Sequence, residues 1–96
     1  MKFDYKFNND NYTIKLHLED DNEISNYLDH LEDGLFYDYS YFVELGLPDG
    51  KQYYWPILNG KIIWSQYSLT IKYFPKEVRL FADNLVYKLY NLKAFI

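Results

Sequence analysis

Residues 2–19 read KFDYKFNNDNYTIKLHLE, and their alternation is the clearest structural signal in the chain. Aromatic and charged side chains alternate over 2–7, and apolar and polar side chains alternate over 12–19. A period of two residues is typical of a strand with one buried face. Between the two runs, residues 8–11 are Asn-Asn-Asp-Asn, a composition that favours a turn. The stretch therefore predicts an N-terminal β-hairpin.

A helix is expected next, at about 21–33. Asp20 suits the N-cap position, and Glu23 follows three residues later, as in a capping box. Gly34 is typical of the residue just beyond a helix C-terminus. The apolar residues recur at i, i+3, i+4 and i+7, which predicts one buried stripe. They are Ile24, Tyr27, Leu28 and Leu31.

Further strands are predicted in the second half of the chain. Alternation over 35–45 indicates a strand that places Tyr37, Tyr39, Tyr41, Val43 and Leu45 on one face. Pro48-Asp49-Gly50 predicts a turn, and a short strand follows over 53–57. Pro56 favours a sheet edge or a bulge for that strand. Asn59-Gly60 predicts a type I′ hairpin turn, after which 62–73 is β-rich throughout, as one bent strand or two shorter ones.

A second amphipathic helix is expected over 76–94. Pro75 suits its first position, and Glu77 lies in its first turn. Its apolar stripe consists of Val78, Phe81, Ala82, Leu85, Leu89, Leu92 and Ile96. The element order is therefore ββ-α-βββ-α over a single domain, 1–96. We expect an α+β fold, with an antiparallel sheet of four to six strands and two helices packed on one face.

Composition excludes several classes of protein. The chain has no cysteine, which rules out disulfides and thiolate chemistry, and its apolar runs are too short to span a membrane. The N-terminus leads straight into a strand pattern, so we expect no signal peptide and a cytoplasmic protein, in the host cytoplasm if the source is viral.

Charge is unevenly distributed along the sequence. Residues 1–15 have a net charge of +1, residues 17–50 carry ten acidic residues and no Lys or Arg, and residues 51–96 have a net charge of +5. The expected first helix bears acidic side chains at both ends, although carboxylates in the last turn of a helix are unfavourable by about 0.3–1 kcal/mol. Either this surface is simply solvated, or it meets a cationic partner.

No catalytic motif is present, and we expect no enzyme, no cofactor and no metal. The two histidines, His17 and His30, lack a metal-ligand spacing, and the four glycines fit caps and turns better than a phosphate loop. His30 has carboxylates nearby, but a solvated surface histidine explains it better than a weak metal site.

The acidic stretch and its tyrosines predict a partner-binding surface. An array of carboxylates resembles the phosphates of a nucleic acid, and tyrosine gives a large contact area at low entropic cost. The candidate contacts are Asp20, Asp21, Glu23, Asp29, Glu32, Asp33, Asp38, Glu44, Tyr37 and Tyr39. We expect a small inhibitor of a basic partner, such as a nuclease or another nucleic-acid-binding effector. Immunity proteins against nuclease toxins and phage proteins that block restriction or CRISPR effectors work on this principle.

An alternative is a nucleic-acid or ligand-binding module that uses an aromatic sheet and the basic C-terminal helix. Trp64, Tyr67 and Tyr73 would stack on bases, and nearby cations would hold phosphates. These cations are Lys61, Lys72, Lys76, Arg79, Lys88 and Lys93. An isoelectric point near 5.0 and a single arginine argue against direct nucleic-acid binding. The partner's identity and the oligomeric state, including a homodimer, stay open at this stage.

Overall fold

A computed structural model describes residues 1–18, 41–66 and 68–93. Its strands are β1 (Lys2–Phe7), β2 (Asp10–His17), β3 (Tyr41–Gly46), β4 (Gln52–Leu58) and β5 (Lys61–Ile62). A 3-10 helix, η1 (Ser68–Tyr73), leads into the long helix α2 (Lys76–Asn91). The helix expected over 21–33 and the first half of the strand expected over 35–45 lie outside the described residues.

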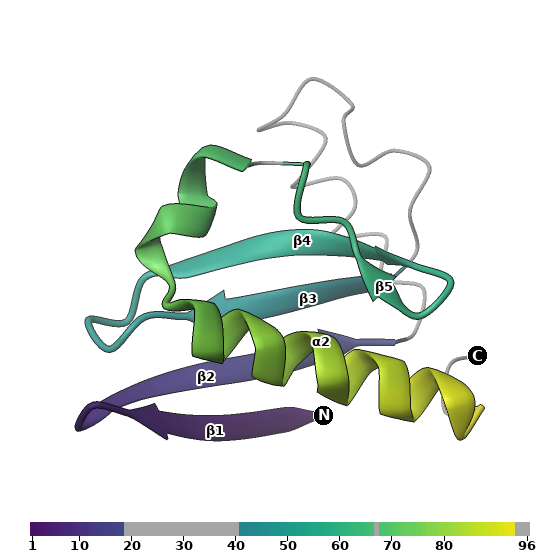
Figure 1. Cartoon of the computed structure of the whole chain (residues 1–96), viewed down its shortest axis with the longest axis horizontal. Coiled ribbons are helices and arrows are strands. Elements are labelled where there is room, and N and C mark those ends of the chain that lie inside the picture. Colours follow the sequence, from purple (N-terminus) through teal and green to yellow (C-terminus); the bar gives the residue numbers. More distant parts are fainter. Residues whose placement is uncertain (19–40, 67, 94–96) are drawn as a thin grey trace.

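The five strands form one antiparallel sheet in the order β1-β2-β3-β4-β5 (Figure 1). Neighbours in the sheet are also neighbours in sequence, so each strand pairs with the one before it. Asn8 and Asn9 both have positive φ, at 50° and 67°, in the tight turn that joins β1 to β2. Asn59 and Gly60 have φ of 52° and 78° in the turn that joins β4 to β5. Two central residues with positive φ define the type I′ turn, which confirms the hairpin predicted at Asn59-Gly60.

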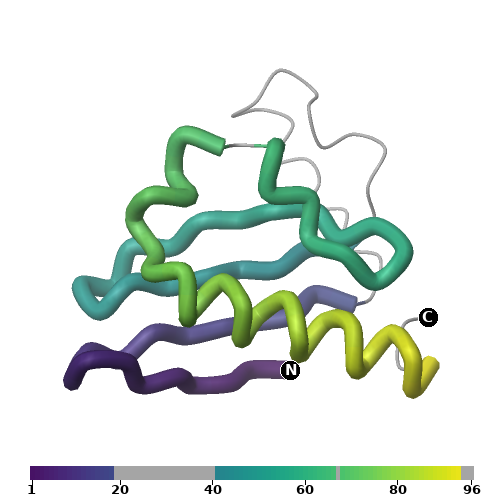
Figure 2. Tube along the Cα trace, in the orientation of Figure 1, coloured from purple at the N-terminus to yellow at the C-terminus, as the bar shows by residue number. Residues whose placement is uncertain are grey.

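Helix α2 covers one face of the sheet, as the chain trace shows (Figure 2). It contacts both β1 and β5, the two strands at opposite edges. Tyr5 of β1 stacks on Phe81 of α2, with ring centroids 4.5 Å apart. The buried residues of this face are Tyr12, Ile14, Leu16, Val43, Leu45, Trp55, Ile57 and Ile62. The expected antiparallel α+β sheet is confirmed, with one long helix on it among the described residues.

The buried stripe of α2 differs slightly from its prediction. Val78, Ala82 and Val86 are completely buried, at i, i+4 and i+8. Val86 was not predicted, whereas Leu92 was predicted to be buried and is 68% exposed. The helix ends at Asn91, so Leu92 no longer follows the helical repeat that would direct its side chain toward the sheet. Pro75 is the N-cap and not the first helical residue.

The prediction of β structure throughout 62–73 was wrong. Strand β5 is two residues long, and η1 occupies Ser68–Tyr73. Ile63 donates its backbone N–H to the carbonyl of Pro56 at 2.9 Å, which continues the β4–β5 register by one pair. The return bond would need a backbone N–H on Pro56, which proline lacks. The ladder therefore ends here. Pro56 lies in β4, between β3 and β5, and so not at an edge of the sheet.

Candidate functional site

Nine of the ten predicted contact residues lie outside the described part of the chain. They are Asp20, Asp21, Glu23, Asp29, Glu32, Asp33, Tyr37, Asp38 and Tyr39. Glu44 is the tenth, and the structure places it in β3 on the sheet face opposite α2. It is only 7% exposed, so little of it is available to a partner.

Glu44 is held by His17 of the neighbouring strand. The imidazole Nε2 lies 3.1 Å from Oε1 of Glu44, and both side chains are close to buried. Because a carboxylate only accepts hydrogen bonds, Nε2 carries a proton and donates the hydrogen bond to Oε1. A buried carboxylate needs such a partner, so the pair fastens β2 to β3 near the strand ends that residues 19–40 connect in the sequence.

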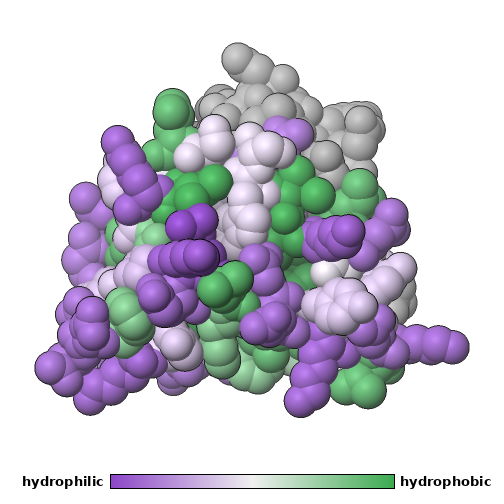
Figure 3. Space-filling view, viewed as in Figure 1, coloured by the Kyte–Doolittle hydropathy of each residue, from purple (hydrophilic) through white to green (hydrophobic). Residues whose placement is uncertain are grey.

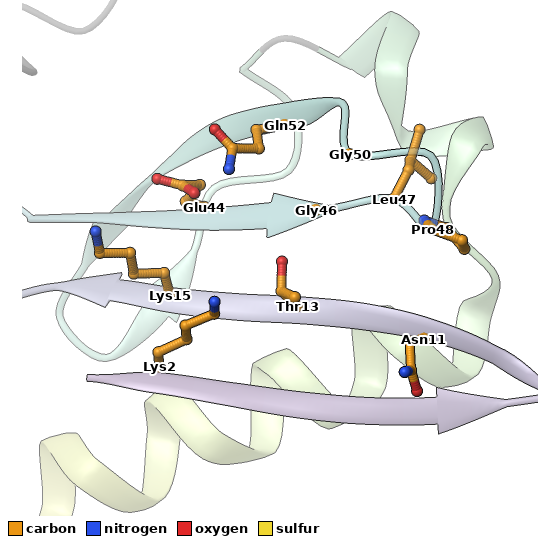
Figure 4. A pocket seen from close by; sticks show the side chains of 10 residues that line it. All are labelled: Lys2, Asn11, Thr13, Lys15, Glu44, Gly46, Leu47, Pro48, Gly50 and Gln52. Atoms are coloured by element: carbon orange, nitrogen blue, oxygen red, sulfur yellow. The ribbon is translucent and has the colours of Figure 1, made fainter.

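A polar pocket of about 370 Å³ lies on the same sheet face (Figure 4). Lys2 and Lys15 face each other across the β1–β2 pair, and Lys15 is also paired in register with Glu44. The remaining lining residues are Asn11, Thr13, Gly46, Leu47, Pro48, Gly50 and Gln52. Like charges directly opposite each other in a sheet are unfavourable. The pocket could therefore accept an anionic group between the two ammonium ions.

Gly46 gives the floor of this pocket its shape. A Cβ on Gly46 would lie 2.2 Å from Oγ1 of Thr13, the residue paired with it on β2. Because Gly46 has no side chain, the Thr13 hydroxyl can lie over strand β3, as Figure 4 shows. The sequence offered a signal here, because Gly46 ends an alternating run, but not the identity of its neighbour.

A second polar contact joins the turn after β5 to helix α2. Trp64 donates its indole N–H to Oδ1 of Asp83 at 2.9 Å, and the Trp64 ring meets Trp55 edge-on, with centroids 5.0 Å apart. Burial raises the pKa of Asp83, while the Trp64 bond and the charge of Arg79 act to lower it. The sequence analysis missed this pair, because Asp83 reads as an ordinary surface position of a helix.

Most aromatic side chains of the sheet face α2, but Phe42 and Tyr54 share the opposite face with His17 and Glu44. Tyr53, Trp55 and Phe74 pack together under the helix, with Trp55 and Phe74 5.7 Å apart. Trp64 is engaged by Asp83, and Tyr73 contacts Tyr53 at 5.4 Å. Among the described residues, the sheet face opposite α2 carries mostly polar side chains, and its Phe42 and Pro56 are completely buried.

Exposed apolar residues on the helix side are interspersed with hydrophilic ones (Figure 3). Leu69, Leu80 and Tyr87 are 82%, 47% and 58% exposed. The described residues contain no group of three His, Asp or Glu side chains that could hold a metal ion. In the same part of the chain, no helix is long and apolar enough to cross a membrane.

Comparisons with protein-family models, with curated proteins and with solved structures found no match to this chain.

Proposed function

We propose that this chain is a small non-catalytic inhibitor that binds a basic, nucleic-acid-processing protein. The supporting observation is how its charge is divided. Residues 19–40 contain eight Asp and Glu and no Lys or Arg, whereas the remaining 74 residues contain all ten basic residues and six acidic ones. A segment this acidic within a chain that is otherwise net basic suits a partner with a cationic groove.

The way the sheet holds the two ends of this segment supports the proposal. Residues 19–40 connect β2 to β3, which are adjacent and paired, with His17 opposite Phe42. The His17–Glu44 bond lies at the same end of the strand pair. Because the paired strands β2 and β3 hold the two ends of residues 19–40 close together, ordering this segment costs less entropy. The sheet therefore serves as a rigid base for an acidic contact surface.

The inhibitory mechanism follows from the chemistry of the partner. An enzyme that handles nucleic acid presents Lys and Arg to phosphates and releases counterions when it binds. Carboxylates placed against those cations displace the substrate without a chemical step. Nuclease toxins, restriction enzymes and CRISPR effectors all present such grooves and are the candidate targets.

The experiment is a cleavage assay with a panel of purified nucleases from these three classes, with and without the protein. We expect inhibition of at least one enzyme, with direct association that weakens as salt rises. The double variant Asp29→Lys/Glu32→Lys should lose most of this inhibition.

The control variant is Asp4→Lys/Glu77→Lys, which changes the net charge equally at two exposed positions outside the acidic segment. It should inhibit as the wild type does. Equal losses in both double variants would reduce the effect to net charge alone, and no inhibition across the panel would argue against the proposal.

The second candidate is a module that binds nucleic acid or a ligand. The opposed Lys2 and Lys15 in the polar pocket favour it, although they lie on the sheet face opposite the C-terminal helix that the sequence predicted for this role. Retention on heparin at low salt that Lys2→Gln/Lys15→Gln abolishes would support it. Passage through heparin with retention on an anion exchanger would favour the inhibitor.

A further inference from the structure

A groove of about 390 Å³ lies between strand β5, with the turns that flank it, and helix α2. Its lining combines one carboxylate, two aromatic rings and several small or polar side chains. The lining residues are Gly60, Lys61, Ile62, Trp64, Asp83, Asn84 and Tyr87. None of them belongs to residues 19–40, so the groove uses none of the acidic residues of that segment.

Asp83 is the charged centre of this groove. One of its oxygens accepts the Trp64 N–H, and within the described ranges the carboxylate makes no ion pair. Arg79 lies one helical turn earlier, close enough to influence Asp83 but not paired with it. Burial raises the pKa of Asp83, and the Trp64 hydrogen bond and the charge of Arg79 offset this only in part. The site therefore holds a partly desolvated carboxylate that no Lys or Arg of the described ranges pairs with.

Two aromatic residues border this carboxylate. The N–H bond to Asp83 fixes the position of the Trp64 indole, which is partly exposed. Tyr87 follows Asp83 by four residues on α2, so it lies on the same side of the helix, and it is 58% exposed. The faces of indole and phenol rings attract cations.

We propose that this groove binds the guanidinium group of an arginine side chain on a protein partner. A guanidinium donates to a carboxylate and lies flat on an aromatic ring, and it loses water more readily than an ammonium ion. Lys61 lines the same groove and opposes the cation, so its charge should limit the affinity. A basic partner would supply such a side chain, although the site does not depend on which partner that is.

The probe is the peptide acetyl-Gly-Arg-Gly-amide, titrated into the ¹⁵N-labelled full chain and followed at the Trp64 indole N–H by NMR. The matched peptide carries citrulline, which has nearly the shape of arginine without its charge. We expect saturable shifts at Trp64 with arginine and none with citrulline. A third peptide with lysine should bind more weakly.

Four variants separate recognition from folding. Asp83→Asn keeps an acceptor for Trp64 and should weaken arginine binding by about tenfold. Tyr87→Ala, at an exposed position, should also weaken it. Lys61→Gln should strengthen binding, an effect that loss of folding would not produce. Glu77→Gln, an exposed carboxylate on the same helix, should leave binding unchanged.

Three outcomes would overturn the inference: no saturable binding, equal binding of the citrulline peptide, or unchanged affinity in Asp83→Asn. A lysine peptide that binds as tightly as arginine would overturn the choice of guanidinium. None of these results bears on nuclease inhibition through residues 19–40, so the two proposals fail separately.

Discussion

Trp64 and Asp83 are joined by a hydrogen bond of 2.9 Å between residues 19 positions apart in the sequence. The bond ties the turn after β5 to the middle of α2. At Trp64 the polypeptide has left the sheet and has not yet entered the helix. It also places a carboxylate where water is scarce. We expect the stability of this edge of the fold, and the arginine recognition proposed above, to depend on that carboxylate.

Asp83 should make the free energy of unfolding depend on pH. Its pKa is raised in the folded protein, so the folded state binds more protons than the unfolded state at pH values around and above about 4. The stability contributed by Asp83 is therefore present at low pH and is lost as pH rises through the folded-state pKa. Asp83→Asn removes this titration and keeps an acceptor for Trp64.

The measurement is urea unfolding of wild type and Asp83→Asn between pH 3 and 7. The stability of Asp83→Asn relative to wild type should increase as pH rises, while the other titrating groups cancel in the difference. A difference that is flat with pH, or that falls, would contradict the desolvation of Asp83.

Gly60→Ala should destabilise the fold more than Gly50→Ala. Both glycines have positive φ, 78° and 93°, so both variants carry a backbone penalty of about 1 kcal/mol. Only Gly60 also faces a side chain, because an added Cβ would lie 2.6 Å from the Tyr90 ring, whereas nothing lies within 4 Å at Gly50. Thermal unfolding of the two variants isolates the clash, and equal losses would show that Tyr90 moves away freely.

His17→Ala should destabilise the protein by about 1–3 kcal/mol, because it leaves the nearly buried Glu44 carboxylate without its donor. His17→Gln keeps an amide donor and should cost less. A double-mutant cycle with Glu44→Ala measures the coupling between the two side chains. Strictly additive losses would mean that the 3.1 Å contact contributes nothing to stability.

Val86→Ala should cost about 2 kcal/mol, since Val86 is completely buried between α2 and the sheet. Leu92→Ala removes a larger side chain but should change stability by less than about 0.5 kcal/mol, because Leu92 is 68% exposed. Chemical denaturation of both variants tests where the helix register ends. A larger loss at Leu92 would place the end of α2 further along the chain.

The sequence by itself predicted several features that depend on near neighbours. Alternation over 2–7 and 12–19 predicted the first hairpin, and Asn59-Gly60 predicted the type I′ turn between β4 and β5. Val78 and Ala82 predicted the buried side of α2. These signals repeat within a few residues, and the backbone geometry that they select is local. The uneven distribution of charge is likewise a property of the sequence alone.

Only the tertiary structure decided the contacts between distant residues. The β4–β5 ladder ends at Pro56, which lacks the N–H for a return bond, and the β-rich run over 62–73 continues as a turn and a 3-10 helix despite its composition. The pairs His17–Glu44 and Trp64–Asp83 join residues 27 and 19 positions apart. Which side chains pair at such distances is set by the strand register and by the angle of the helix on the sheet. Neither the register nor the angle can be read from the short-range periodicity of the sequence.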